Sequence, residues 1–65
     1  MKVRELIRLL EKDGWALVRT KGSHRQFHHS SKRGTVTVSG GLGVDVPRGT
    51  LRSALKQAGF IDEKE

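Results

Sequence analysis

The sequence contains no cysteine, no tyrosine, one proline and no long hydrophobic run. Without cysteine there is no disulfide framework and no thiolate chemistry, which fits a reduced, cytoplasmic setting. No apolar run approaches the ~18 residues of a membrane span, and no charged-then-apolar leader is present, so neither feature is predicted. Hydrophobic residues make up 34% of the 65 positions, which limits the chain to one small core.

Acidic residues are also scarce, since seven Asp and Glu stand against 13 Lys and Arg, for a net charge of +6. On so small a domain this excess favours a polyanionic partner, which could be nucleic acid, an anionic membrane or an acidic protein. A basic domain without such a partner is the alternative that composition leaves open.

Two segments have the apolar spacing of amphipathic helices, at i, i+3, i+4 and i+7. The first is residues 3–10, and Gly14 and Trp15 are placed to end it, the glycine as the helix stop and the tryptophan as a plug against the last turn. The second is residues 51–58, with Pro47 marking the helix start.

Residues 15–21 and 24–29 are predicted to be strands joined by the two-residue loop Gly22-Ser23, which suits a type II′ turn. The loop also fixes the cross-strand register. The predicted pairs are Lys21–His24, Thr20–Arg25, Arg19–Gln26, Val18–Phe27 and Leu17–His28. The apolar pair of Val18 and Phe27 marks the core face, which favours a core role for Phe27 over base stacking. Polar side chains then share the other face: Arg19, Lys21, His24, Gln26 and His28.

Residues 35–38 form a short third strand by their alternation of Thr and Val, and the glycine-rich residues 39–43 are expected to be a mobile loop. The order predicts an α+β fold, α-β-β-β-α, in which two helices cover one face of a three-stranded antiparallel sheet. We expect a single domain over residues 1–61 and a polar C-terminal tail over residues 62–65.

Three parts of the chain resemble the HicA toxin family, also described as YcfA-like. They are the helix and stop at residues 6–15, the Lys-Gly-Ser-His turn at residues 21–24 with Phe27, and the tail at residues 47–52 and 55–59. The resemblance implies a double-stranded-RNA-binding-domain-like fold and a toxin that cleaves mRNA and is sequestered by a HicB antitoxin. It also implies that His24 is the catalytic residue. Many relatives have a polar segment after the third strand, often with His or Pro, where this chain has its glycine-rich loop.

RNA cleavage through the 2′-hydroxyl needs a base, an acid and a cation to stabilise charge on phosphorus. We expect His24 to transfer the protons and Lys21, directly opposite, to stabilise the phosphate, with no cofactor. His28 shares the face but lies ~13 Å away along the strand, so one-histidine catalysis is predicted. Arg19, Ser23, Gln26 and His28 are candidate RNA contacts, and the alternative for each is an ordinary solvated side chain.

A metal site is the alternative for the three histidines, His24, His28 and His29. Their spacing suits a helical zinc site, but they fall in a predicted strand, and no cysteine or clustered carboxylate completes a set of ligands. Asp13 and Asp45 are isolated in the sequence, so two-metal nuclease chemistry lacks its carboxylates as well. We therefore predict no metal.

A non-catalytic double-stranded-RNA-binding module remains the second hypothesis. Arg48 and Arg52, with Lys56 a turn later, would contact major-groove phosphates from the second helix. An adaptor for an acidic protein is a third. If the chain is instead an RNA-cleaving toxin, which is the first hypothesis, an acidic antitoxin is expected to cover His24 and the strip formed by Lys21 and Arg19.

Overall fold

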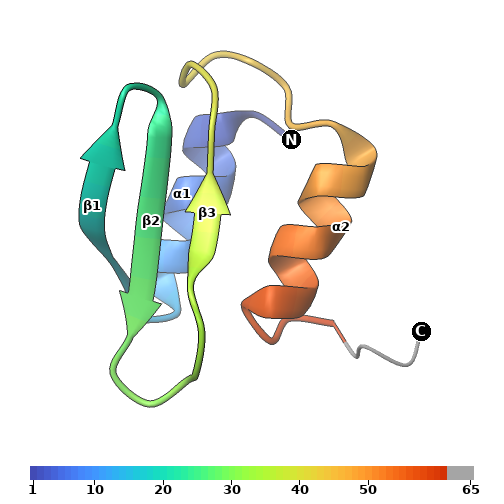
Figure 1. The fold of residues 1–65 in the computed structure, drawn as a ribbon. Coiled ribbons are helices and arrows are strands. Elements are labelled where there is room, and N and C mark those ends of the chain that lie inside the picture. The colour runs from blue at the N-terminus through green and yellow to red at the C-terminus, as the bar shows by residue number, and fades with distance from the viewer. Residues whose placement is uncertain (62–65) are drawn as a thin grey trace.

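The computed structural model describes residues 1–61, and the predicted polar tail at residues 62–65 lies outside this part. The elements follow in the order α1 (Val3–Lys12), β1 (Trp15–Lys21), β2 (His24–His29), β3 (Val36–Val38) and α2 (Arg48–Gln57). The strands form one antiparallel sheet in the order β1-β2-β3. Figure 1 shows both helices on the same side of this sheet, which confirms the predicted fold.

The core lies between the sheet and the two helices. Its buried residues are Val3, Leu6, Leu10, Trp15, Phe27, Val36, Val38, Ala54 and Ala58. They include three residues of the stripe predicted for the first helix, the inward valines of β3, Ala54 of α2 and Ala58 just after it. The core residues come from one side of each helix and strand, so the other face of the sheet is open to solvent and carries polar side chains.

The end of α1 follows the glycine-stop pattern that its sequence predicts. Gly14 has a φ of +103°, and a Cβ built there would lie 2.9 Å from Nε2 of His29, so glycine is required both for conformation and for space. Trp15 is buried, and its ring packs edge-on against the His29 ring with centroids 5.2 Å apart. The prediction that Trp15 plugs the helix end is confirmed.

The β1–β2 hairpin begins as predicted at its turn. Gly22 has a φ of +60°. Among the described residues only glycines have a positive φ, so the φ of Ser23 is negative, as a type II′ turn requires. Lys21 pairs with His24, as the two-residue loop predicts. The next two predicted pairs, Thr20–Arg25 and Arg19–Gln26, are confirmed as well.

Further along the hairpin the predicted register is wrong by one residue. The register shifts between Leu17 and Arg19, so that Leu17 pairs with Phe27 and Ala16 pairs with His28. Val18 is the extra residue of this β-bulge, and it is 52% exposed. Phe27 is in the core as predicted, but Val18 is neither its partner nor part of the core.

The glycine-rich residues 39–43 form a loop, as predicted, but hydrogen bonds join this region to the rest of the domain. The carbonyl of Leu42 accepts the N–H of Arg4 (3.1 Å), and that of Val44 accepts the N–H of Val3 (2.9 Å). These two N–H groups belong to the first turn of α1 and have no partner within the helix. The loop therefore helps to complete the N-terminus of α1, and its expected mobility stays a prediction.

Lys32 joins the C-terminal ends of the two helices. Its Nζ lies 2.6 Å from a carboxylate oxygen of Asp13, just after α1, and 3.1 Å from the carbonyl of Ala58, just after α2. The hydrogen bond from Lys32 is the largest of the effects that hold the pKa of Asp13 below its usual value of 3.8. The unfolded chain therefore takes up a proton at Asp13 before the folded protein does as the pH falls.

This difference predicts a loss of stability in acid. The contribution of Asp13 is complete above its usual pKa of 3.8 and is lost as the pH falls through the lowered folded-state value. We expect Asp13→Asn to lower the thermal midpoint at neutral pH, with a gap to wild type that narrows in this acidic range. Thermal unfolding followed by circular dichroism from pH 7 to pH 2 measures this difference in midpoint. Glu11→Gln, at an exposed position, is the control. A gap that stays constant over that range would show that the Asp13–Lys32 pair is not its source.

Candidate functional site

A small recess lies on the polar face of the hairpin, next to its turn. It has a volume of about 230 Å³ and is lined by Arg19, Lys21, His24 and Gln26. These residues meet because they form two successive pairs on the same face, Lys21 with His24 and Arg19 with Gln26. The turn chemistry and the period-two alternation of strands thus explain the whole lining of this recess.

Within the recess, an imidazole and an ammonium group flank the turn directly. His24 and Lys21 are cross-strand partners on either side of Gly22-Ser23, and such partners have Cβ atoms ~5 Å apart. Both side chains are exposed, so an anionic ligand can reach them together. Ser23 lies in the turn beside His24 and is also exposed.

The other two histidines lie in different surroundings. His28 is on the same face as His24, but its Nε2 is 3.0 Å from the hydroxyl of Thr35, and it does not line the recess. His29 points to the other side, where its Nε2 lies 2.7 Å from the carbonyl oxygen of Asp13 and its Nδ1 accepts the N–H of Ser31 at 3.0 Å. Among residues 1–61, no three His, Asp or Glu side chains cluster so as to hold a metal ion.

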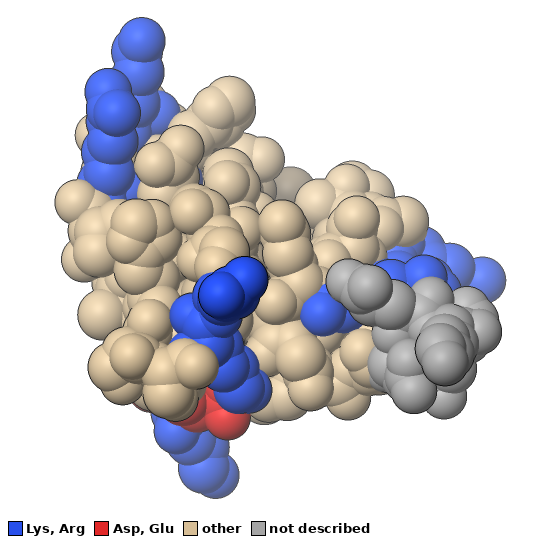
Figure 2. Space-filling model, turned by 60° about the horizontal axis from the view of Figure 1, so that its bottom comes forward, with Lys and Arg blue, Asp and Glu red and all other residues tan. Residues whose placement is uncertain are grey.

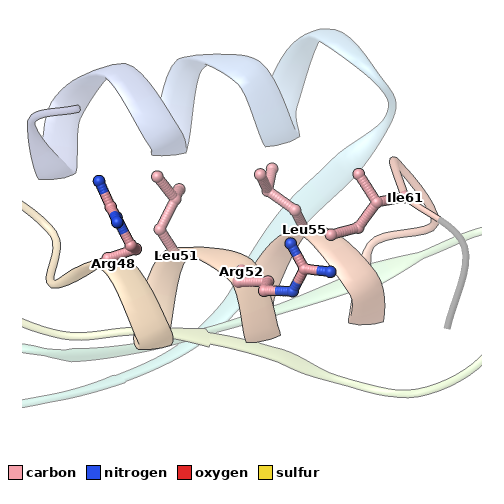
Figure 3. Close-up of a pocket in the computed structure, with 5 residues that line it drawn as sticks. All are labelled: Arg48, Leu51, Arg52, Leu55 and Ile61. Atoms are coloured by element: carbon pink, nitrogen blue, oxygen red, sulfur yellow. The ribbon is translucent and has the colours of Figure 1, made fainter. Parts of the chain in front are cut away.

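Arg48 and Arg52 are placed apart from the recess. They line a different hollow of about 440 Å³ on α2, together with Leu51, Leu55 and Ile61. Figure 3 shows the three apolar side chains along this hollow with Arg48 at one end. The structure therefore does not bring these two arginines to His24.

Basic side chains do not form one continuous surface on the face shown in Figure 2. Lys and Arg lie there in several separate groups, and acidic atoms are visible in one place. A duplex lying along this face would meet only scattered cations, whereas several aligned phosphate contacts supply most of the non-specific affinity for nucleic acid.

Arg25 also contacts the turn, although no pattern in the sequence marked it as a candidate site residue. Its Nη1 lies 2.9 Å from the carbonyl oxygen of Gly40 and 3.3 Å from that of Ser23. The alternation of β2 places Arg25 on the face opposite His24, the same face as the buried Phe27. A charged residue at a core-facing position is the sequence signal that could have drawn attention to it.

The profile of the family described as "HicA toxin of bacterial toxin-antitoxin" matches residues 3–60. A chain of the solved structure titled "Toxin-Antitoxin complex from Streptococcus pneumoniae" is 33% identical, with coverage of 91% of this chain and 97% of that one and a TM-score of 0.72. No curated protein sequence matches significantly.

The fold and these matches define a small basic α+β protein of the toxin–antitoxin class. The chain belongs to the HicA toxin family, which confirms the resemblance seen in its sequence. Within residues 1–61, neither helix has the length and apolar character that crossing a membrane requires.

Proposed function

We propose that this chain is the toxin of a type II toxin–antitoxin system and that it cleaves mRNA as a metal-independent endoribonuclease. The observation that carries the proposal is the pairing of His24 with Lys21 across the Gly22-Ser23 turn, in a recess that Arg19 and Gln26 complete. Membership of the HicA family supports it, because the turn histidine is the residue that the family resemblance marks as catalytic.

The reaction that suits this recess is internal transfer of the phosphoryl group. The 2′-oxygen of a ribose attacks the adjacent phosphorus, the bond from phosphorus to the 5′-oxygen breaks, and the products carry a 2′,3′-cyclic phosphate and a 5′-hydroxyl. His24 removes the proton of the 2′-hydroxyl as general base, and a proton reaches the leaving 5′-oxygen from water or from the protonated imidazole. Lys21 stabilises the negative charge that develops on the phosphoryl oxygens.

The remaining residues of the turn and the strands bind the substrate in this proposal. Arg19 and Gln26 contact the RNA on the far side of the recess from the turn, and Ser23 contacts the phosphate from the turn itself. His28 lies four residues further along β2, ~13 Å from His24, so it would contact a neighbouring nucleotide and not the scissile phosphate. Because mRNA is the substrate, the proposed site of action is the cytoplasm.

An antitoxin is the protein partner that we propose, as in the toxin–antitoxin complex of the similar structure. The net charge of +6 suits an acidic, HicB-like protein, and inhibition requires cover over His24, Lys21 and Arg19. A complex in which these three side chains keep their full solvent exposure would contradict this part of the proposal.

The experiment that tests the activity compares RNA with DNA. The purified chain is incubated with a single-stranded RNA and with the DNA of the same sequence, both in excess EDTA. We expect cleavage of the RNA alone, with cyclic phosphate ends in the products, because DNA lacks the 2′-hydroxyl nucleophile. Cleavage of both strands, or no cleavage once the metal is chelated, would reject this mechanism.

The purified chain can also be used to test the second candidate function, that of a non-catalytic double-stranded-RNA-binding module. That function would use Arg48 and Arg52 at the start of α2, where dsRNA-binding domains contact the phosphates that line the major groove. It predicts intact RNA and an affinity that falls steeply with salt, as several phosphate contacts require. Loss of that binding in the Arg48→Ala variant would support it.

A further inference from the structure

Arg25 links the turn that carries His24 to the glycine-rich loop. We infer that it is a positioning residue for the proposed cleavage reaction: it holds the Ser23–His24 peptide so that the imidazole points into the recess. The inference rests on the function proposed above, and it concerns a residue on the opposite face of β2 from the recess. Arg25 does not need to touch RNA for this role.

The contacts of Arg25 define what it holds. Its Nη1 donates to the carbonyl oxygen of Gly40 at 2.9 Å, an ordinary hydrogen-bond length, and reaches that of Ser23 at a longer 3.3 Å. The Ser23 carbonyl belongs to the peptide bond that leads into His24, so a fixed oxygen limits rotation of that peptide plane. The direction in which the His24 side chain leaves the backbone is limited with it.

The other end of this link is anchored to the rest of the domain. Gly40 lies in the loop whose following residues, Leu42 and Val44, accept the first N–H groups of α1. Gly40 itself has a φ of +104°, and a Cβ there would approach a methyl group of Val3 at 3.6 Å. The guanidinium group therefore connects a two-residue turn at the tip of the sheet to the N-terminus of a helix.

The position of Arg25 separates this role from direct RNA binding. Its Cα pairs with Val38, a buried residue of β3, and Arg25 itself is partly buried. Its Nη1 donates to two backbone carbonyls, those of Gly40 and Ser23. By contrast, Arg19 and Lys21 line the recess on the other face. Removal of Arg25 should therefore alter the rate of the chemical step more than the affinity for RNA.

The test uses Arg25→Met, which keeps most of the apolar stem but removes the donors, and Arg25→Lys, which restores a donor group. We expect Arg25→Met to lower kcat about 10- to 100-fold, with KM for RNA nearly unchanged, because small displacements of a reacting group have costs of this size. Arg25→Lys should recover most of the rate, since one ammonium group has three donors and can bond to two carbonyls. The exposed Arg33→Met controls for the loss of one positive charge.

The outcomes that decide the inference are the following. A higher KM and a smaller salt dependence with unchanged kcat would make Arg25 an RNA contact and overturn it. A loss that Arg25→Lys fails to restore, or an Arg25→Met variant with wild-type kcat, would overturn it as well. In a His24→Ala background Arg25→Met should cause no further loss, because both changes act through the same imidazole. If His24→Ala alone is fully active, the proposed function itself is rejected, independently of the result for the Arg25 variants.

Discussion

Replacing His24 with alanine is expected to lower the rate of RNA cleavage by about 10²- to 10⁴-fold, the usual contribution of a positioned proton-transfer group. The side chain is exposed in the recess beside Lys21, so its loss leaves the core untouched. The free energy of unfolding should therefore change by less than about 0.5 kcal/mol. Single-turnover cleavage of a labelled RNA measures the rate, and growth after induction in cells gives an independent readout.

His28→Ala is the matched control for this prediction. It removes the same kind of side chain from the same face of the same strand, but His28 bonds to the hydroxyl of Thr35 and does not line the recess. We expect a change of less than about tenfold, in KM more than in kcat, because the proposed role of His28 is substrate contact. If the two variants lose activity equally, or if His24→Ala arrests growth as wild type does, His24 is not the proton-transfer group.

Replacing Phe27 with alanine is expected to unfold a large fraction of the protein. Phe27 is 1% exposed at the centre of the sheet, and truncation of a buried Phe costs about 3–5 kcal/mol. A domain of 65 residues has a total stability of only about 3–10 kcal/mol at the usual value per residue. Urea unfolding followed by circular dichroism should therefore show a much lower midpoint or no folded baseline at all.

Val18→Ala tests the β-bulge in the same assay. The simple hairpin register makes Val18 the core partner of Phe27, and its truncation would then cost about 1–2.5 kcal/mol through lost burial. In the structure Val18 is the extra residue of the bulge and is 52% exposed, so the expected change is below about 0.5 kcal/mol. A cost near that of a buried valine would mean that the hairpin has no bulge in solution.

The elements of this fold could be predicted from the sequence because each has a local cause. The apolar stripes give the helices, Gly14 gives the end of α1, and Gly22 gives a turn that sets the nearest strand pairs. The bulge could not be located in this way, although the sequence contains a sign of it. Trp15 needs burial, whereas Arg19 and Lys21 need solvent, yet all three have the same parity in β1. One extra residue between them resolves the conflict, because it moves Trp15 to the core face.

The candidate site, too, has positions that the sequence predicts and positions that it does not. The positions of Arg19, Lys21, His24 and Gln26 follow from the turn and the alternation of two neighbouring strands, so the sequence predicted their shared face. The place of Arg48 depends on how α2 packs against the sheet, which no local pattern reveals. The contacts of Arg25 depend on a loop 15 positions away in the chain, and glycine-rich segments give no sign of which carbonyls they present.

The connection of the N-terminus to residues 42–46 determines when the fold can be completed during synthesis. Lys2 and Asp45, which form an ion pair at 3.3 Å, are 43 positions apart, so this closure joins two parts of the chain that are far apart in the sequence. Contacts of such separation form late and slowly, because a long loop must first be closed. A nascent chain that stops before Leu42 therefore contains the whole hairpin with His24 but lacks the acceptors that fasten its first helix.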